Sequence, residues 1–256
     1  MSEETPRVRT ADEGGVRTLW LSRPEKRKAL DPRMIVELKD SLRAADRDGD
    51  VRVIALRGEG KDFCSGADLA ALRDIADAPV EQNLADVDEL AELFTLIREV
   101  RRPVVAVVQG RALAGGCGLA TACDLIVASG DARFGYPEVR VGFVPAMVMA
   151  ILRRNVSEKR AFALIAMGDT LTAEEAERIG LVNRVIAAER FEDGARAYLE
   201  ELADRDATAV MLCKRLLYQV DGMGFEASIR AGADMNVLAR MTESTRAGVA
   251  RFLDRG

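Results

Sequence analysis

The residues of this sequence that are best suited to chemistry are one glutamate and two glycine-containing turns. Glu138 directly follows Pro137 and precedes the apolar run from Val141 to Leu152. A carboxyl group beside buried surface has its charged form disfavoured, which helps it to carry a proton near neutral pH. Glu138 is therefore a candidate general acid or base. On local sequence alone, a glutamate in a solvated loop is the more common alternative.

The two turns each follow a predicted strand, and they cover Phe63 to Leu69 and Gly110 to Ala120. Each turn can place backbone N–H groups at the start of a helix, where developing negative charge is stabilised. Two such amides that converge on one oxygen atom would form an oxyanion hole. Most glycine-containing turns are only tight turns, so the pattern by itself does not distinguish a structural turn from one that forms an oxyanion hole. The second turn lacks both the Lys-Ser/Thr of a Walker loop and the third glycine of a dinucleotide-binding fingerprint.

The composition narrows the chemistry further. The 256 residues include no histidine, which excludes Ser-His-Asp and Cys-His catalysis and histidine-bearing zinc sites. With 37 basic and 42 acidic side chains and 5% aromatic residues, the chain is not expected to have a nucleic-acid partner. A basic cluster could bind phosphates, although such a run is more often a solvated face; it consists of Arg23, Lys26, Arg27 and Lys28.

Cellular location is also constrained by the sequence. The N-terminus has no apolar signal-peptide core and the longest apolar stretch is too short to span a bilayer, so we expect a cytoplasmic protein with no membrane partner. No CxxC pair occurs among the cysteines, which are Cys64, Cys117, Cys123 and Cys213. We interpret them as reduced, mostly buried thiols, and no metal site is expected.

An α/β core must position these residues. Asp31 and Pro32 predict the start of a helix, as its N-cap and first residue. A helix over 84–100 separates two predicted strands, which indicates β-α-β connections. The strands are expected at 8–10, 16–21, 51–56, 103–108 and 125–128, with a short edge strand within 181–186. The tail has helical patterns over 191–202, 210–220 and 225–241, and we expect it to dock on the core or on a neighbouring subunit.

Five ordered segments and part of the tail carry a resemblance to a known family. They are residues 23–30, 63–69, 106–124, 134–145 and 173–185, with 248–252 in the tail. In order and spacing, this set resembles the crotonase superfamily, the enoyl-CoA hydratase/isomerase family. The resemblance implies an α/β fold of the ClpP/crotonase type, a spiral of β-β-α units that forms two near-perpendicular sheets. It also implies a crotonase-like core over 1–190 and a C-terminal helical trimerisation region over 191–256.

The resemblance further implies an acyl-CoA thioester substrate, a role in fatty acid metabolism and no separate cofactor, since CoA is part of the substrate. The backbone N–H groups of Ala67 and Gly115 would hold the thioester oxygen. Cationic side chains would lie along the CoA phosphates and adenine, namely Lys26, Arg27 and Lys28. CoA would also contact Ala29, Ala67, Asp68 and Leu69, and Phe252 of the partner subunit would close the nucleotide end. A homo-oligomer, either a trimer or a dimer of trimers, is implied.

The sequence departs from the hydratase pattern at one position. That pattern carries two glutamates, and this chain keeps one as Glu138 but has Gly118 in place of the other. A glycine supplies no acid or base, and it could make room for a branched acyl group. The leading hypothesis is an enoyl-CoA hydratase with Glu138 as proton donor and acceptor. The alternatives are an enoyl-CoA isomerase that uses Glu138 alone, or a non-catalytic acyl-CoA-binding homologue.

Overall fold

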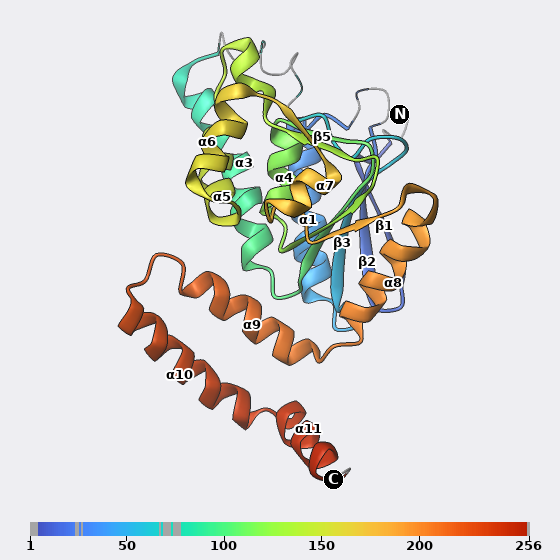
Figure 1. The fold of residues 1–256 in the computed structure, drawn as a ribbon, viewed down its shortest axis with the longest axis vertical. Helices are drawn as coiled ribbons and strands as arrows, with labels where there is room; N and C mark the ends of the chain where they lie inside the picture. The colour runs from blue at the N-terminus through green and yellow to red at the C-terminus, as the bar shows by residue number, and fades with distance from the viewer. Residues whose placement is uncertain are drawn as a thin grey trace.

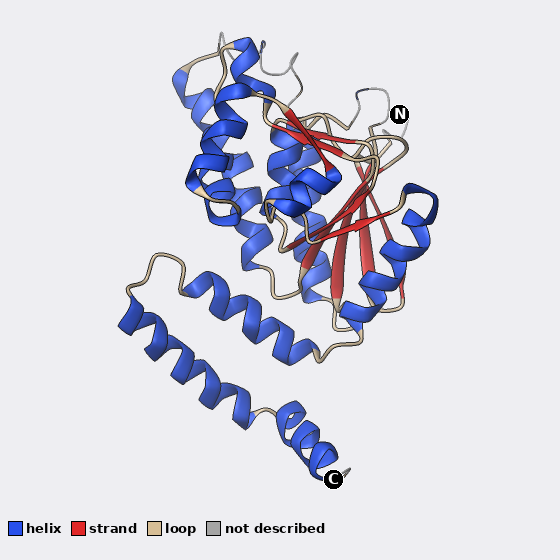
Figure 2. Cartoon of the chain, viewed as in Figure 1, coloured by secondary structure: helices blue, strands red, loops and turns tan. Residues whose placement is uncertain are grey.

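The computed structural model describes residues 5–23, 26, 28–66, 68, 73 and 78–254, and the strands within them form two sheets (Figure 2). The larger sheet has the order β1 (Val8–Glu13), β2 (Val16–Leu21), β3 (Val53–Gly58), β4 (Val104–Val108), β6 (Leu125–Ser129) and β9 (Arg184–Ile186). Only β1 and β2 pair antiparallel in it. The smaller sheet contains β5 (Arg111–Leu113), β7 (Arg133–Gly135) and β8 (Thr170–Thr172). The resemblance implies a second sheet, but the local sequence predicts none of these three strands.

The centre of the larger sheet is covered on both faces, as its β-branched sequence predicts. Every residue of β4 is buried, and the side chains alternate between two apolar clusters. Val104 and Val108 join the cluster beneath α1 (Pro32–Arg47), α3 (Val80–Glu99), α4 (Gly115–Ala122) and α5 (Ala146–Asn155). Val105 and Val107 face the opposite way, toward α8 (Phe191–Ala203). The predicted α/β core is confirmed.

Helix starts follow the capping residues in the sequence. The Asp31 carboxylate accepts a hydrogen bond from the Met34 N–H at 2.8 Å, with Pro32 as first residue of α1. Thr172 and Glu175 form a capping box at the start of α7 (Ala173–Arg178). Each cap satisfies N–H groups that have no partner inside the helix. The short helical elements that complete the body are η2 (Pro137–Val141), α6 (Glu158–Met167) and η3 (Ala188–Arg190).

The tail consists of α9 (Ala207–Gln219), α10 (Phe225–Met241) and α11 (Glu243–Leu253), which extend away from the body (Figure 1). A buried lysine ties α9 to the body. The Lys214 ammonium donates to the carbonyls of Ile97 at 2.8 Å and Arg102 at 2.9 Å and pairs with Asp124 at 2.7 Å. Helix α8 packs on the larger sheet, so the helices that extend away from the body begin after α8. The predicted boundary between the core and the C-terminal helical region, at residue 190, stays a prediction.

The expectation that the run from Val141 to Leu152 is buried is wrong for its first part. Val141, Phe143 and Val144 are 73%, 52% and 60% exposed. Val141 ends η2, and Phe143 and Val144 lie between η2 and α5, where no α-helical periodicity turns side chains inward. Within α5 the period of 3.6 residues brings Val148, Ile151 and Leu152 to the buried side. No helix in the described part of the chain is long and apolar enough to cross a membrane.

Candidate active site

The turn at the start of α4 presents a backbone amide to the site. Ala114 precedes the helix with φ 51° and ψ −133°, a backbone conformation that residues with a side chain rarely adopt. The Ala114 N–H donates to the Gly135 carbonyl at 2.8 Å and its own carbonyl accepts from the Gly118 N–H at 3.0 Å. These bonds hold the strained residue. Gly115 follows as the first helical residue, where a helix leaves its N–H without an internal acceptor.

The other turn packs directly against this helix start. The backbone of Cys64 pairs with β5, since its N–H donates to the Arg111 carbonyl at 3.1 Å and its carbonyl accepts from Leu113 at 3.0 Å. Gly66 has φ 94°, and a Cβ on it would lie 3.0 Å from the Gly115 nitrogen. The two glycine-containing turns therefore meet, as an oxyanion hole requires. Ala67 and Leu69 lie outside the described residues, so their roles stay predictions.

Glu138 lies in η2 and is buried, with 9% of its surface exposed. Its Oε2 atom is buried and has no hydrogen-bond partner within the described ranges. Burial raises the pKa of Glu138 above its ordinary value because the charged form loses hydration. The solvated-loop alternative is thus excluded by the structure. A carboxyl with a raised pKa and a vacant oxygen is suited to accept and return a proton.

The surroundings of Glu138 include one face of α4. Burial raises the pKa of the Cys117 thiol to about 11, and the Glu138 carboxyl acts in the same direction. Tyr136, two residues before the glutamate, shares a 2.7 Å hydrogen bond with the Thr121 hydroxyl of α4. Burial likewise raises the pKa of Cys64 to about 12. Both thiols are therefore neutral at physiological pH, and neither is suited to act as a nucleophile.

Gly118 is covered by a side chain of the same molecule. A Cβ built on Gly118 would lie 2.3 Å from Cγ2 of Val148, a residue of α5 that is 4% exposed. Two carbon atoms cannot approach that closely. The valine side chain therefore packs directly against Gly118 and leaves no space for a Cβ there. The expectation that Gly118 makes room for a branched acyl group stays a prediction.

The predicted CoA-binding cations differ in exposure. Lys26 is exposed, whereas Lys28 is 3% exposed, with φ 55° and a pKa that burial lowers below its ordinary value. Arg27 lies outside the described residues. Ala29 is buried, and Asp68 pairs with Arg23 at 2.8 Å. Phe252, on α11, is 80% exposed. The structure thus brings Ala29, Asp68 and Gly115 into neighbouring segments, and the roles of all these residues stay predictions.

The model of one protein family, described as enoyl-CoA hydratase/isomerase, matches residues 11–256. The chain belongs to this family. A Thermus thermophilus relative, whose name assigns it provisionally as an enoyl-CoA hydratase, is 39% identical over 95% of this chain and 96% of its own. The 2,3-dehydroadipyl-CoA hydratase of Escherichia coli is 30% identical over 93% and 91% of the two chains.

Solved structures of the same family confirm the predicted crotonase-like fold. The crystal structure of an enoyl-CoA hydratase from Mycobacterium smegmatis superposes with a TM-score of 0.93 at 32% identity, and covers 98% of this chain and 97% of its own. The family member described here is accordingly an α/β protein with a helical C-terminal region, and its activity class is acyl-CoA processing by an enoyl-CoA hydratase/isomerase.

Two residues near the site were not assigned these contacts from the sequence. Val148 is one of several valines in an apolar run, and nothing in the run marks it as the partner of Gly118. Arg23 belongs to the basic cluster, whose pattern favours a solvated face, but its side chain is buried. Its position two residues after the end of β2 and before a proline indicates burial, because a side chain there lies at the edge of the core.

Proposed function

We propose that the protein adds water to 2-enoyl-CoA thioesters, with Glu138 as the proton-transferring carboxyl. The observation that carries this proposal is the buried Glu138 carboxyl, with one oxygen vacant within the described ranges. The names of the hydratase relatives support the reaction class. We further propose that the N–H groups of Ala67 and Gly115 bind the thioester oxygen.

One carboxyl can perform both proton transfers of a syn addition. Ionised Glu138 takes a proton from water while the water oxygen bonds to Cβ of the substrate, and the electrons of the double bond move onto the thioester oxygen. The resulting enolate is stabilised by the two amides, each worth on the order of 3 kcal/mol. Protonated Glu138 then returns the proton to Cα, which restores the carbonyl and the ionised carboxylate. No second carboxylate is needed at Gly118.

Substrate and subunit contacts complete the proposal. Lys26, Arg27 and Lys28 would meet the phosphates and adenine of CoA, with Lys26 the exposed cation among the described two. CoA is part of the substrate, so no separate cofactor is proposed. The tail helices expose large apolar side chains, among them Phe225 at 81% and Phe252 at 80%. We propose that these are buried in a homo-oligomer, a trimer or a dimer of trimers, in the cytoplasm.

Double-bond isomerisation is the second candidate. The Gly118–Val148 contact favours it, because position 118 carries no carboxylate and the side chain that packs against it is apolar. In that reaction Glu138 would take a proton from one carbon of the acyl chain and return it to another. A non-catalytic acyl-CoA-binding protein would bind enoyl-CoA but would form neither the hydrated nor the isomerised product.

Incubation with 2-enoyl-, 3-enoyl- and branched enoyl-CoAs, followed by mass spectrometry and chromatography, tests these proposals. Hydration adds the mass of one water, whereas isomerisation changes retention at constant mass. Glu138→Gln should lower turnover at least about a hundredfold with little change in CoA affinity. Glu189→Gln, in the exposed η3, is the matched control. Full activity of the Glu138 variant would refute the mechanism.

A further inference from the structure

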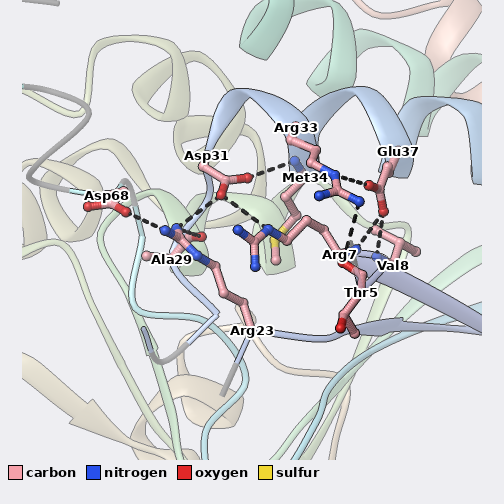
Figure 3. Close-up of polar contacts among 10 residues, drawn as sticks. All are labelled: Thr5, Arg7, Val8, Arg23, Ala29, Asp31, Arg33, Met34, Glu37 and Asp68. Atoms are coloured by element: carbon pink, nitrogen blue, oxygen red, sulfur yellow. Dashed lines mark hydrogen bonds and ion pairs between the residues drawn. The ribbon is translucent and has the colours of Figure 1, made fainter. Parts of the chain in front are cut away.

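A buried arginine connects the first glycine-containing turn to the segment that leads into α1. Arg23 is 8% exposed, and its guanidinium contacts two segments of chain, residues 29–31 and Asp68 (Figure 3). One terminal nitrogen pairs with the Asp68 carboxylate at 2.8 Å. The other donates to the Ala29 carbonyl at 3.1 Å and lies 3.3 Å from the Asp31 carboxylate. A planar guanidinium can hold several acceptors in fixed directions, which an ammonium cannot.

Each of these three partners belongs to a part of the proposed site or supports one. Asp68 follows the turn whose Gly66 packs against Gly115. Ala29 directly follows the basic segment 26–28, and Asp31 caps α1. The main chain adds two bonds between the same segments: Leu30 N–H to the Gly66 carbonyl at 2.8 Å and Asp68 N–H to the Leu30 carbonyl at 3.1 Å.

The charges around this arginine are arranged to keep it in place. The carboxylates of Asp31 and Asp68 are 14% and 11% exposed, so the Arg23 guanidinium lies between two largely buried acceptors. Arg7 also approaches Asp31, at 3.4 Å. Arg23 contacts both Asp31, the N-cap of α1, and Asp68 (Figure 3). Removing the Arg23 guanidinium would leave Asp68 without its 2.8 Å ion pair.

We propose that Arg23 is a positioning residue for the oxyanion hole: it fixes Asp68, in the turn whose Gly66 packs against Gly115, relative to residues 29–31 and the start of α1. The inference rests on the proposed function. A displacement of about 1 Å at a reacting centre can lower turnover by about a hundredfold. We therefore expect Arg23→Met to lower kcat by roughly 10- to 100-fold, with KM changed by no more than about threefold.

A chromophoric thioester separates positioning from general stability. The absorption of 4-aminocinnamoyl-CoA moves to longer wavelength when hydrogen-bond donors polarise its carbonyl group. The wild-type protein should produce this shift, and Arg23→Met should bind the probe with most of the shift lost. Arg23→Lys should restore part of it. Arg17→Met is the control, because Arg17 also pairs with two carboxylates, Asp12 and Asp48, at 2.5 and 2.8 Å.

The outcomes are distinguishable. If Arg23→Met shows the full wild-type shift and turnover, the positioning role is overturned. If that variant does not fold, Asp68→Asn removes the same ion pair from the other side and should reduce the shift, whereas an unchanged shift overturns the inference. A wild-type protein that neither converts enoyl-CoA nor shifts the probe removes the proposed function, and the inference with it.

Discussion

The close approach of Gly118 to Val148 predicts that the effect of a methyl group at position 118 changes sign with the residue at 148. Glycine inside a helix ordinarily destabilises it by about 1 kcal/mol relative to alanine, so Gly118→Ala would stabilise an uncrowded helix. Here the added Cβ would lie 2.3 Å from Val148 Cγ2. Overpacking of this kind costs about 1–3 kcal/mol. The substitution should therefore be neutral or destabilise the protein by up to about 2 kcal/mol.

Shortening the valine should reverse this result. Val148→Ala removes two buried methyl groups and should cost about 2 kcal/mol. In that background the methyl at position 118 enters the vacated space. Gly118→Ala should then stabilise the protein by about 1 kcal/mol. The coupling free energy between the two positions would accordingly be about 1–3 kcal/mol, well above the error expected for independent sites.

Urea unfolding of the four proteins of this double-mutant cycle, at one protein concentration, measures the coupling. Trp20 is the only tryptophan and supplies a fluorescence signal, with circular dichroism as the second probe. Equal stabilisation by Gly118→Ala in the wild-type and Val148→Ala backgrounds would show that Val148 does not crowd position 118. It would also refute the explanation that packing against Val148 excludes a side chain at position 118.

Three further results are expected. Burial raises the pKa of Glu138, so the folded state loses stability as the pH rises from the ordinary carboxyl pKa through the raised one. Glu138→Gln should therefore stabilise the protein in thermal melts near about pH 8 and much less near about pH 5. An equal gain in stability at both pH values would contradict the raised pKa. Lys214→Met should lower the free energy of unfolding in urea by about 3–5 kcal/mol, because the Asp124 carboxylate loses its ion pair with the Lys214 ammonium at 2.7 Å. A decrease of less than about 1 kcal/mol would show that this pair contributes no more than a surface ion pair. Thr172→Ala should cost about 1 kcal/mol through loss of the capping box, and Thr95→Ala, on exposed helix surface, is its control.

Local signals in the sequence predicted most of the elements. The Asp31 cap and the β-branched strand β4 each depend on residues next to one another, and each lies where expected. The resemblance implies a second sheet, but no local pattern predicts its strands or α11. Strands β5, β7 and β8 have three residues each, which is too short for a period of two to be distinguished from a turn.

The site was only partly predictable for a different reason. Glu138 and the Gly115 turn can be recognised from neighbouring residues. Contacts such as Arg23 with Asp68, or Gly118 with Val148, join positions that are distant in the sequence. Such contacts are set by tertiary packing, and no pattern of charge or hydropathy in a single sequence specifies which arginine or valine makes them.

The Gly118–Val148 contact also bears on how many carboxylates the site can hold. A Cβ at position 118 would need the space that Val148 Cγ2 occupies, so glycine and valine at these two places pack as one unit. A glutamate introduced at position 118 alone would therefore force Val148 to move. In the proposed mechanism, proton transfer depends on the environment of Glu138, whose burial raises its pKa and keeps its neutral form accessible. A single carboxyl can complete that reaction only if the amides hold the enolate in one position. The ion pair of Arg23 with Asp68 and its hydrogen bond to the Ala29 carbonyl would supply that restraint.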